Sequence, residues 1–206
     1  MRYSIIDHRL SGVRFVASPF ADERPESVEP ELVIVHGISL PPGEFGGPHV
    51  DELFLGTLDP SAHPYFAQIQ GMEVSSHVFI RRDGEATQFV SFDRRAWHAG
   101  KSNWCGRERC NDFSIGIELE GTDDTPYTRA QYEALAGIVK ALQAAYPALQ
   151  GDRIAGHSID DRDGVWRDVA AAGRCRAGSG VDGPRGPSDR DRPESGCEGC
   201  EALQAL

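Results

Sequence analysis

Lysine, methionine and long apolar runs are scarce in this chain of 206 residues. Only 2 of its 21 basic residues are lysines, and its formal net charge is −11. A nucleic-acid-binding surface needs clustered basic side chains, so this charge balance argues against such a partner. No apolar stretch approaches the roughly 20 residues that a membrane-spanning helix requires. We therefore expect no nucleic-acid partner and no membrane partner.

A secretory signal is also lacking. Asp7, His8 and Arg9 interrupt the N-terminal segment where a signal peptide would have its apolar core. This predicts a cytoplasmic protein.

Cys197 and Cys200 form a single C-x-x-C pair, whereas a zinc ribbon requires two such pairs.

The last 49 residues, 158–206, contain no Phe, Tyr, Met or Lys and are rich in Gly, Arg, Asp and Glu. Such a segment cannot bury enough apolar surface to offset its conformational entropy. We therefore predict one globular domain over residues 1–157, with its first 30 or so residues partly extended, and a disordered tail over residues 158–206.

The globular part mixes strand and helix patterns, which predicts an α/β domain with helices packed on a largely buried sheet. Residues 31–36 form the most apolar run and are typical of a strand buried on both faces. The clearest helix covers residues 129–146, where Thr128 and Gln131 form a capping box and Pro147 ends the helix. Two strands are expected at 75–82 and 85–90, joined in a hairpin at Asp83 and Gly84. Other strands are expected at 13–17, 113–119 and 153–155, a short helix at 63–70, and a polar loop at 18–30.

Three histidines occur in similar settings, near strand ends or beside small residues. His36 ends the most apolar run, His157 follows a short strand, and His98 comes directly after Trp97. A histidine at the end of a strand is held rigidly and can still face a cleft, as catalytic and metal-binding side chains often do. The alternative for each is a hydrogen-bonded structural histidine, which is the role we expect for His77 inside a strand.

Glu118 lies within the apolar strand predicted at residues 113–119. A buried carboxylate must be paired, protonated or bound to a metal, because an isolated buried charge is costly. One interpretation is an ion pair with Arg107 or Arg109. The other is a catalytic zinc site, which takes three protein ligands and leaves the fourth position to water.

Five segments carry long and specific motifs: residues 35–48 (VHGISLPPGEFGGP), 56–60 (GTLDP), 80–84 (IRRDG), 95–100 (RAWHAG) and 106–121 (GRERCNDFSIGIELEG). In these segments the chain resembles the cytoplasmic AmpD-type N-acetyl-anhydromuramyl-L-alanine amidases of the type 2 amidase and peptidoglycan-recognition superfamily. The resemblance covers residues 31–157. It implies a central mixed β-sheet flanked by helices, one Zn²⁺ ion, and hydrolysis of the amide between the lactyl group of anhydro-N-acetylmuramic acid and L-alanine.

The resemblance also implies roles for residues at matching positions. His36 and His157 match the two histidine zinc ligands, and Glu118 matches the catalytic glutamate. Zinc would lower the pKa of its bound water towards about 7, and Glu118 would carry a proton from that water to the departing nitrogen. Substrate contacts are implied for a further set of residues: Trp97, His98, Gly100, Arg109 and Asn111.

The chain departs from the family pattern after His157. The family continues with a catalytic lysine and with an aspartate, the third zinc ligand, about ten residues beyond the histidine. Val165 and Arg167 occupy these positions here. The nearby carboxylates, none in the expected context, are Asp160, Asp161, Asp163 and Asp168. One hypothesis is a shift of reading frame just after Ser158; the other is a diverged member of the family.

The favoured hypothesis is a monomeric zinc amidase of cell-wall recycling that acts on small anhydro-muramyl peptides. A member that binds muropeptides without hydrolysing them is the alternative, because the third zinc ligand is missing from its expected place. An amidase acting on the intact cell wall is a weaker alternative, since the chain has no signal peptide.

Overall fold

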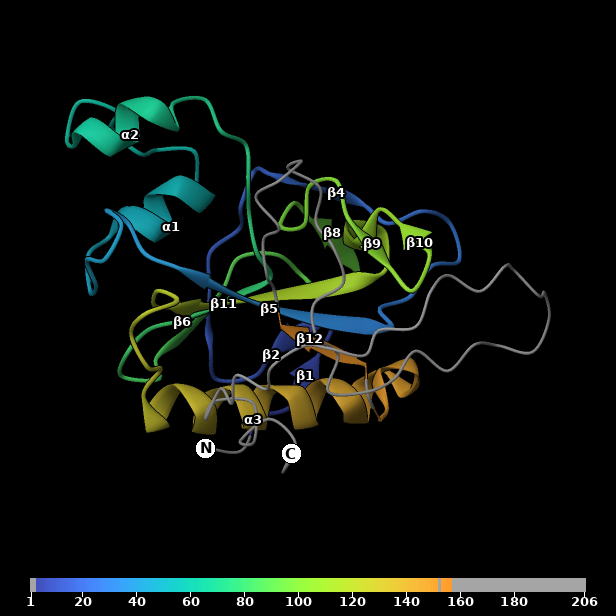
Figure 1. Cartoon of the computed structure of the whole chain (residues 1–206). Coiled ribbons are helices and arrows are strands. Elements are labelled where there is room, and N and C mark those ends of the chain that lie inside the picture. Colours follow the sequence, from blue (N-terminus) through green and yellow to red (C-terminus); the bar gives the residue numbers. More distant parts are fainter. Residues whose placement is uncertain (1–2, 152, 157–206) are drawn as a thin grey trace, which may run out of the picture.

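The computed structural model describes residues 3–151 and 153–156. At its centre is a six-stranded sheet in the order β12-β5-β11-β6-β7-β3. Helix α3 covers one face of this sheet, and α1 and α2 lie beyond the other (Figure 1). The strands are β3 (Arg14–Phe15), β5 (Leu32–Ile38), β6 (Val78–Ile80), β7 (Ala86–Gln88), β11 (Ser114–Glu120) and β12 (Ile154–Gly156).

The sheet is mixed, as expected. Strands β12, β5, β11 and β6 pair in parallel, β6 and β7 pair antiparallel, and β7 pairs in parallel with β3. The antiparallel pair is the hairpin predicted at Asp83 and Gly84, and Gly84 has a φ of 87°. A Cβ atom at Gly84 would lie 2.9 Å from the carbonyl oxygen of Ala130. The turn therefore favours glycine for two reasons, the positive φ and the lack of room for a side chain.

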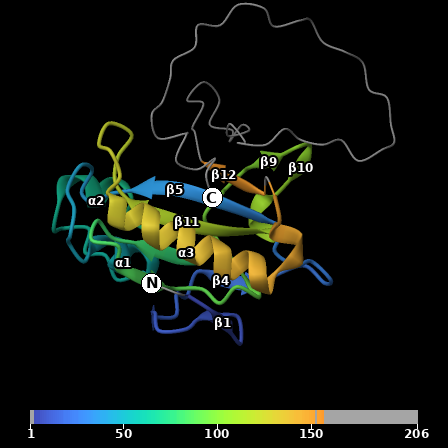
Figure 2. The ribbon, with the colours of Figure 1, turned by 90° about the horizontal axis from the view of Figure 1, so that it is seen from below.

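Helix α3 (Arg129–Ala145) begins at the predicted capping box. The Thr128 hydroxyl accepts a hydrogen bond from the backbone N–H of Gln131, and the Gln131 side chain accepts one from the backbone N–H of Thr128. Leu135, Ile138 and Leu142 recur at helical spacing and are buried against the sheet. Figure 2 shows this helix running across the sheet next to β5 and β11.

Smaller elements surround the sheet. They are β1 (Ile5–Ile6) paired with β2 (Arg9–Leu10), β4 (Ala21–Glu23) paired with β8 (Arg94–Ala96), β9 (Asn103–Trp104) paired with β10 (Arg107–Glu108), α1 (His49–Phe54), α2 (Pro64–Gln68), and the 3-10 turns η1 (Cys110–Asp112) and η2 (Pro147–Leu149). The predicted loop at 18–30 was therefore wrong in part, because β4 forms there by pairing with a distant strand. Helix α1 was not predicted, since its six residues are too few to show a clear helical period.

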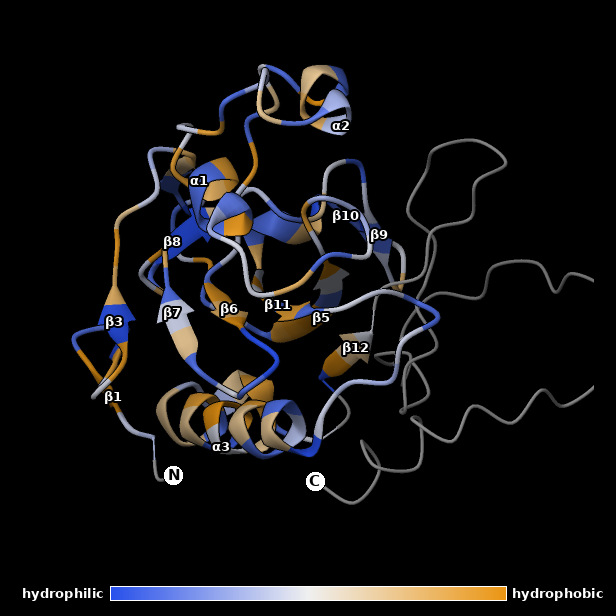
Figure 3. Ribbon diagram, turned by 90° about the vertical axis from the view of Figure 1, so that its left-hand side faces the viewer, coloured by the Kyte–Doolittle hydropathy of each residue, from blue (hydrophilic) through white to orange (hydrophobic). Residues whose placement is uncertain are grey.

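Alternation along the strands assigns each side chain to a face. In β11, Ile115, Ile117 and Leu119 pack in the core beneath α3, so Ser114, Gly116 and Glu118 face the opposite side. In β5, Val33 and Val35 belong to the same core, so His36 lies on the side that Glu118 faces. Figure 3 shows the sheet between α3 below and α1 with β8 above. The candidate site lies on the side of the sheet away from α3.

None of the helices within residues 3–151 and 153–156 combines the length and the apolar character needed to cross a membrane. The predicted boundary at residue 157 and the predicted tail over residues 158–206 lie outside the described residues.

Candidate active site

His36 and Glu118 lie side by side on the two central strands. Strands β5 and β11 pair in register, so the Cα atoms of His36 and Glu118 are direct partners. Because the two strands run parallel and share a face, the imidazole and the carboxyl group project into the same layer. Both side chains are buried, with relative exposures of 4% and 8%.

Glu118 is a buried carboxyl group without an ion pair in the described part of the chain. Its Oε2 atom is buried and has no hydrogen-bond partner among the described residues. Burial raises its pKa to about 8 from an ordinary value of 4.5. The predicted ion-pair alternatives are wrong, because Arg107 pairs with Glu31 and Arg109 pairs with Asp112. Glu118 can therefore hold or release a proton near neutral pH.

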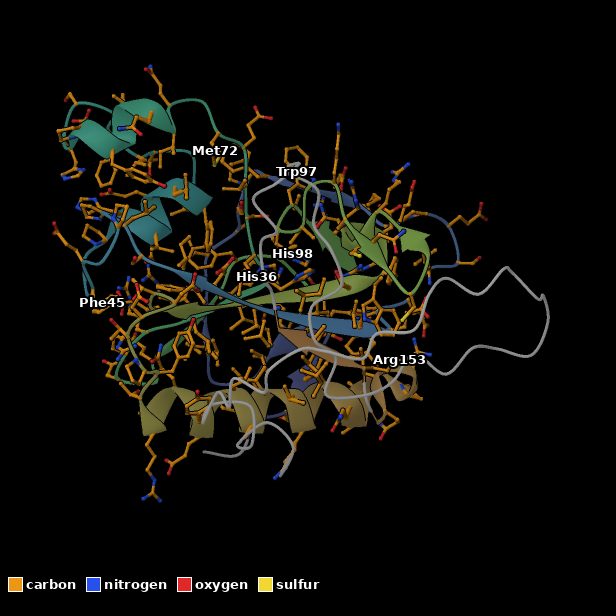
Figure 4. The ribbon with its side chains drawn as sticks, viewed as in Figure 1. His36, Phe45, Met72, Trp97, His98 and Arg153 are labelled. Atoms are coloured by element: carbon orange, nitrogen blue, oxygen red, sulfur yellow. The ribbon has the colours of Figure 1, made fainter. Side chains whose placement is uncertain are left out.

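His98 lies directly against His36. The Nε2 atom of His36 is 2.9 Å from the Nδ1 atom of His98, and the two rings meet edge to face. On its other side, the Nε2 atom of His98 is 3.2 Å from the hydroxyl of Ser114. Figure 4 shows His36 and His98 on the side of the sheet away from α3, with Trp97 farther out. The structure thus brings three of the predicted site residues together.

The loop that carries His98 is held by Asn111. The side-chain oxygen of this buried residue accepts hydrogen bonds from the backbone N–H groups of His98, at 3.2 Å, and Ala99, at 2.8 Å. This amide oxygen therefore positions the loop beside the site. A direct contact of Asn111 with substrate stays a prediction.

Trp97, Gly100 and Arg109 are the other residues for which substrate contacts are predicted. The half-buried indole of Trp97 donates a hydrogen bond to Asp22 and lies beside Phe20. Gly100 is exposed, and so is Arg109, whose guanidinium forms its ion pair with Asp112 at 3.1 Å. Substrate contacts for these three residues stay predictions.

His77 is the structural histidine that its position in a strand predicted. Its Nδ1 atom accepts a hydrogen bond from the backbone N–H of Gly116, so its Nε2 carries the proton and donates to the carbonyl of Arg94. Complete burial lowers its pKa to about 3, and the positive charge of Arg24 nearby adds to this effect. His77 therefore stays neutral, with both ring nitrogens bonded to backbone groups and the Nη2 atom of Arg24 lying 3.1 Å from its Nε2.

A zinc site would need more ligands than the described residues bring together. No group of three or more His, Cys, Asp or Glu side chains that could hold a metal ion occurs within residues 3–151 and 153–156. His36 supplies one imidazole of the kind that zinc binds, and Glu118 supplies an adjacent buried carboxyl group. Strand β12 ends at Gly156, which pairs with Val35. His157 follows Gly156 in sequence, and it and the four candidate aspartates lie outside the described residues. The donor types fit zinc, and the described residues provide only part of the set.

Ser114 and Arg24 belong to the surroundings of the site, and neither was predicted from the sequence. Ser114 could have been found from the alternation of side chains along residues 114–120, because alternation places Ser114 on the same face of the strand as Glu118. No local pattern marks Arg24, whose guanidinium donates hydrogen bonds to the carbonyls of Asn111, Asp112 and Ser114. These three partners lie 87 to 90 positions away from Arg24 in sequence.

Comparison with known proteins defines the class of this chain. A family model described as N-acetylmuramoyl-L-alanine amidase matches residues 26–174, so the chain belongs to this family of hydrolases. In particular, it is similar to 1,6-anhydro-N-acetylmuramyl-L-alanine amidase AmpD of Salmonella typhimurium strain LT2, at 62% identity over 72% of this chain and 79% of the relative. AmpD of Escherichia coli K12 is 62% identical over 67% of this chain and 75% of that protein.

Solved structures of AmpD proteins agree with the fold. A crystal structure of a selenomethionine derivative of AmpD matches with a TM-score of 0.72 and 58% identity, over 74% of this chain and 84% of that chain. The solution structure of Citrobacter freundii AmpD matches with a TM-score of 0.54 and 58% identity, over 74% of this chain and 81% of that chain. The predicted mixed sheet flanked by helices and the predicted membership of this amidase group are confirmed.

Proposed function

We propose that this protein is a zinc-dependent amidase of cell-wall recycling. Its substrate is a small muropeptide, and the bond cleaved joins the lactyl group of 1,6-anhydro-N-acetylmuramic acid to L-alanine. The observation that carries the proposal is the buried Glu118 beside His36, in a chain 62% identical to AmpD amidases. We also propose that it acts as a monomer in the cytoplasm.

The residues divide the chemistry between them. His36 and His157 would hold zinc, which when bound polarises the amide carbonyl and lowers the pKa of a bound water. Glu118 accepts a proton from the attacking water and donates it to the departing nitrogen. A general acid–base group works best with a pKa near the operating pH, and burial alone moves the pKa of Glu118 in the metal-free chain from 4.5 to about 8.

The remaining site residues would orient the substrate. The exposed guanidinium of Arg109 suits a carboxylate of the peptide stem, to which it can donate paired hydrogen bonds. The indole of Trp97, fixed by its hydrogen bond to Asp22, offers an aromatic surface. Asn111 keeps the backbone of His98 and Ala99 in place.

A second candidate function is muropeptide binding without hydrolysis. The specific observation in its favour is in the sequence, where Val165 and Arg167 stand at the positions at which the resemblance expects a lysine and an aspartate. A site that lacks one ligand holds zinc less tightly and with less defined geometry.

The deciding experiment measures zinc content and hydrolysis together. The full chain, purified without chelator, is incubated with anhydro-muramyl tripeptide, and release of the peptide is followed by chromatography. We expect weak zinc binding and activity that a chelator removes. Tripeptide binding without release at saturating zinc would favour the second candidate, and activity that survives complete zinc removal would rule out the zinc mechanism.

A Glu118→Gln variant tests the role of the carboxyl group in the same assay. Glutamine keeps the shape of the side chain but cannot exchange the proton. We expect activity to be lost while zinc content matches that of the parent. Equal loss of zinc and activity would instead make Glu118 a metal ligand.

A further inference from the structure

The His98 ring fits into a space that Gly116 leaves open. A Cβ atom at Gly116 would lie 2.4 Å from Cγ of His98, closer than any side chain could approach without displacing the ring. The backbone of His98 is held at the same time by Asn111, and the ring itself is buried. The orientation of the imidazole is thus set by packing on one side and by hydrogen bonds to the backbone on the other.

The hydroxyl of Ser114 determines which nitrogen of His98 carries the proton. The Ser114 side chain donates its hydrogen to the carbonyl oxygen of Cys110, at 2.6 Å. A serine hydroxyl has one hydrogen, so towards Nε2 of His98, at 3.2 Å, the Ser114 oxygen can only accept. Nε2 of His98 therefore carries a proton, and in the neutral ring Nδ1 is the acceptor.

The position of the proton on His98 also determines the position of the proton on His36. Nδ1 of His98 accepts a hydrogen bond at 2.9 Å, so its partner, Nε2 of His36, must carry the donated proton. A neutral imidazole has one N–H group, so Nδ1 of His36 carries the lone pair. The order of donation runs from His36 to His98, then to Ser114, and ends at the carbonyl of Cys110.

We propose that His98 and Ser114 are positioning residues that hold His36 in a single tautomer, with Nδ1 as the nitrogen that binds the metal. The resemblance implied that His98 contacts substrate, which stays a prediction; the geometry places its ring directly against Nε2 of His36. The metal-binding part of this inference rests on the proposed function, whereas the tautomer does not. Hydrogen-bond partners behind a histidine ligand fix its tautomer and ring orientation and commonly affect metal affinity by about 10-fold to 100-fold.

The buried histidines on this side of the sheet use their nitrogens differently. His77 has both ring nitrogens in hydrogen bonds to backbone groups, which is the arrangement of a structural histidine. His36 spends Nε2 on another side chain, His98, and that side chain depends in turn on Ser114. This series of side chains determines which nitrogen of His36 carries the proton. A backbone carbonyl could do the same for a purely structural ring. The series of side chains also couples His36 to the loop that carries Trp97.

The test reads the tautomer directly. The full chain is labelled with ¹⁵N-histidine and stripped of metal, and long-range ¹H–¹⁵N correlation spectra identify the protonated nitrogen of each ring, with His36→Gln assigning the His36 signals. We expect His36 to carry its proton on Nε2. We expect Ser114→Ala to produce a mixture of tautomers at His98 and His36, and Ser114→Thr, which keeps the hydroxyl, to restore the single form.

Ser76→Ala is the matched control. Ser76 is another buried serine, and its hydroxyl has no hydrogen-bond partner among the described residues, so its removal should leave the His36 spectrum unchanged. Zinc affinity, measured by competition with a chromogenic chelator, should fall about 10-fold or more in Ser114→Ala and remain at the parent value in Ser76→Ala.

Two results would overturn the inference. One is a proton on Nδ1 of His36 in the parent chain, and the other is a Ser114→Ala spectrum identical to that of the parent. If the tautomers behave as expected and the parent hydrolyses no muropeptide at saturating zinc, the positioning of His36 stands and the proposed function fails. The parent spectrum decides the tautomer even if a variant does not fold.

Discussion

Glu118 and His77 are both buried, and burial moves their pKa values in opposite directions. The carboxyl group of Glu118 is neutral when protonated, so burial raises its pKa to about 8. The imidazole of His77 is neutral when deprotonated, so burial lowers its pKa to about 3. At neutral pH the protein therefore favours the uncharged form of each group. These opposite shifts give two predictions about stability.

Replacing Glu118 with glutamine should stabilise the metal-free protein at high pH. Between pH 4.5 and about 8, the folded state keeps a proton on Glu118 that the unfolded chain has lost, so the free energy of unfolding falls as the pH rises. Glutamine has no such proton. We expect Glu118→Gln to unfold at higher urea concentration than the parent near pH 8, by on the order of a few kcal/mol.

The same comparison near pH 4 provides the control, because Glu118 is then protonated in both states. The two proteins should be of similar stability there. A stability difference of the same size at both pH values would show that packing, and not the proton, separates the two chains.

The neutral state of His77 predicts acid sensitivity. Between pH 6.5 and about 3, the unfolded chain binds a proton that folded His77 does not, so stability is complete above this window and is lost as the pH falls through it. One such group contributes a slope of at most about 1.4 kcal/mol per pH unit. We expect His77→Gln to be less stable at pH 7 and to lose stability less steeply between about pH 6 and pH 4, measured by urea unfolding. An unchanged slope would contradict the assignment.

At the scale of elements, strand β11 serves two purposes through its alternation. Ile115, Ile117 and Leu119 provide the core beneath α3, and the residues between them provide the floor of the site. Gly116 is part of that floor because only a residue without a side chain leaves room for His98. The register with β5 then places Glu118 beside His36.

Gly116→Ala should disturb the site more than the fold. The added methyl group would lie 2.4 Å from Cγ of His98, so the ring must move. Overpacking of this kind typically costs about 1–3 kcal/mol, and we expect a loss of that size in thermal unfolding together with a loss of amidase activity. Gly47→Ala is the control, since a Cβ there lies 3.4 Å from the nearest atom of His49. Full activity of Gly116→Ala would contradict the position of His98.

The elements themselves differ in how well sequence predicted them. The buried strand β5, the hairpin at Asp83 and Gly84, and helix α3 with its cap were predicted, because each is specified by neighbouring residues. Strand β4 was not, because its pairing with β8 depends on residues about 70 positions away in sequence. Glu118 was recognised as unusual from its strand, whereas its lack of an ion pair with any described residue could be established only once Arg107 and Arg109 were placed.

At the scale of the whole molecule, Arg24 ties the N-terminal segment to the site. Its partly buried guanidinium donates hydrogen bonds to the carbonyl groups of Phe92, Asn111, Asp112 and Ser114. Burial lowers its pKa to about 10, which still leaves the side chain charged at neutral pH. The segment predicted to be partly extended is therefore fastened to the turn and strand that hold His98.

Removing this guanidinium should weaken the whole domain. Arg24→Met leaves several buried carbonyl groups without a donor, so we expect the free energy of unfolding to fall by roughly 2–4 kcal/mol in urea. Arg129→Met is the control, because its exposed ion pair with Glu133 should contribute less than about 1 kcal/mol. Equal stability of the two variants would contradict the role of Arg24.

The sequence by itself predicted an α/β domain, the capped helix and the amidase motifs, because periodicity, capping and contiguous motifs are local properties of the chain. The mixed sheet was implied by the family resemblance that those motifs carry. It also identified His36 and Glu118 as unusual residues. Only the tertiary structure decided that these two lie side by side, that His98 supports His36, and that Glu118 is buried without an ion pair among the described residues. Strand register, burial and the shared face of the sheet arise from contacts between residues far apart in sequence, and these contacts set the chemistry of the site.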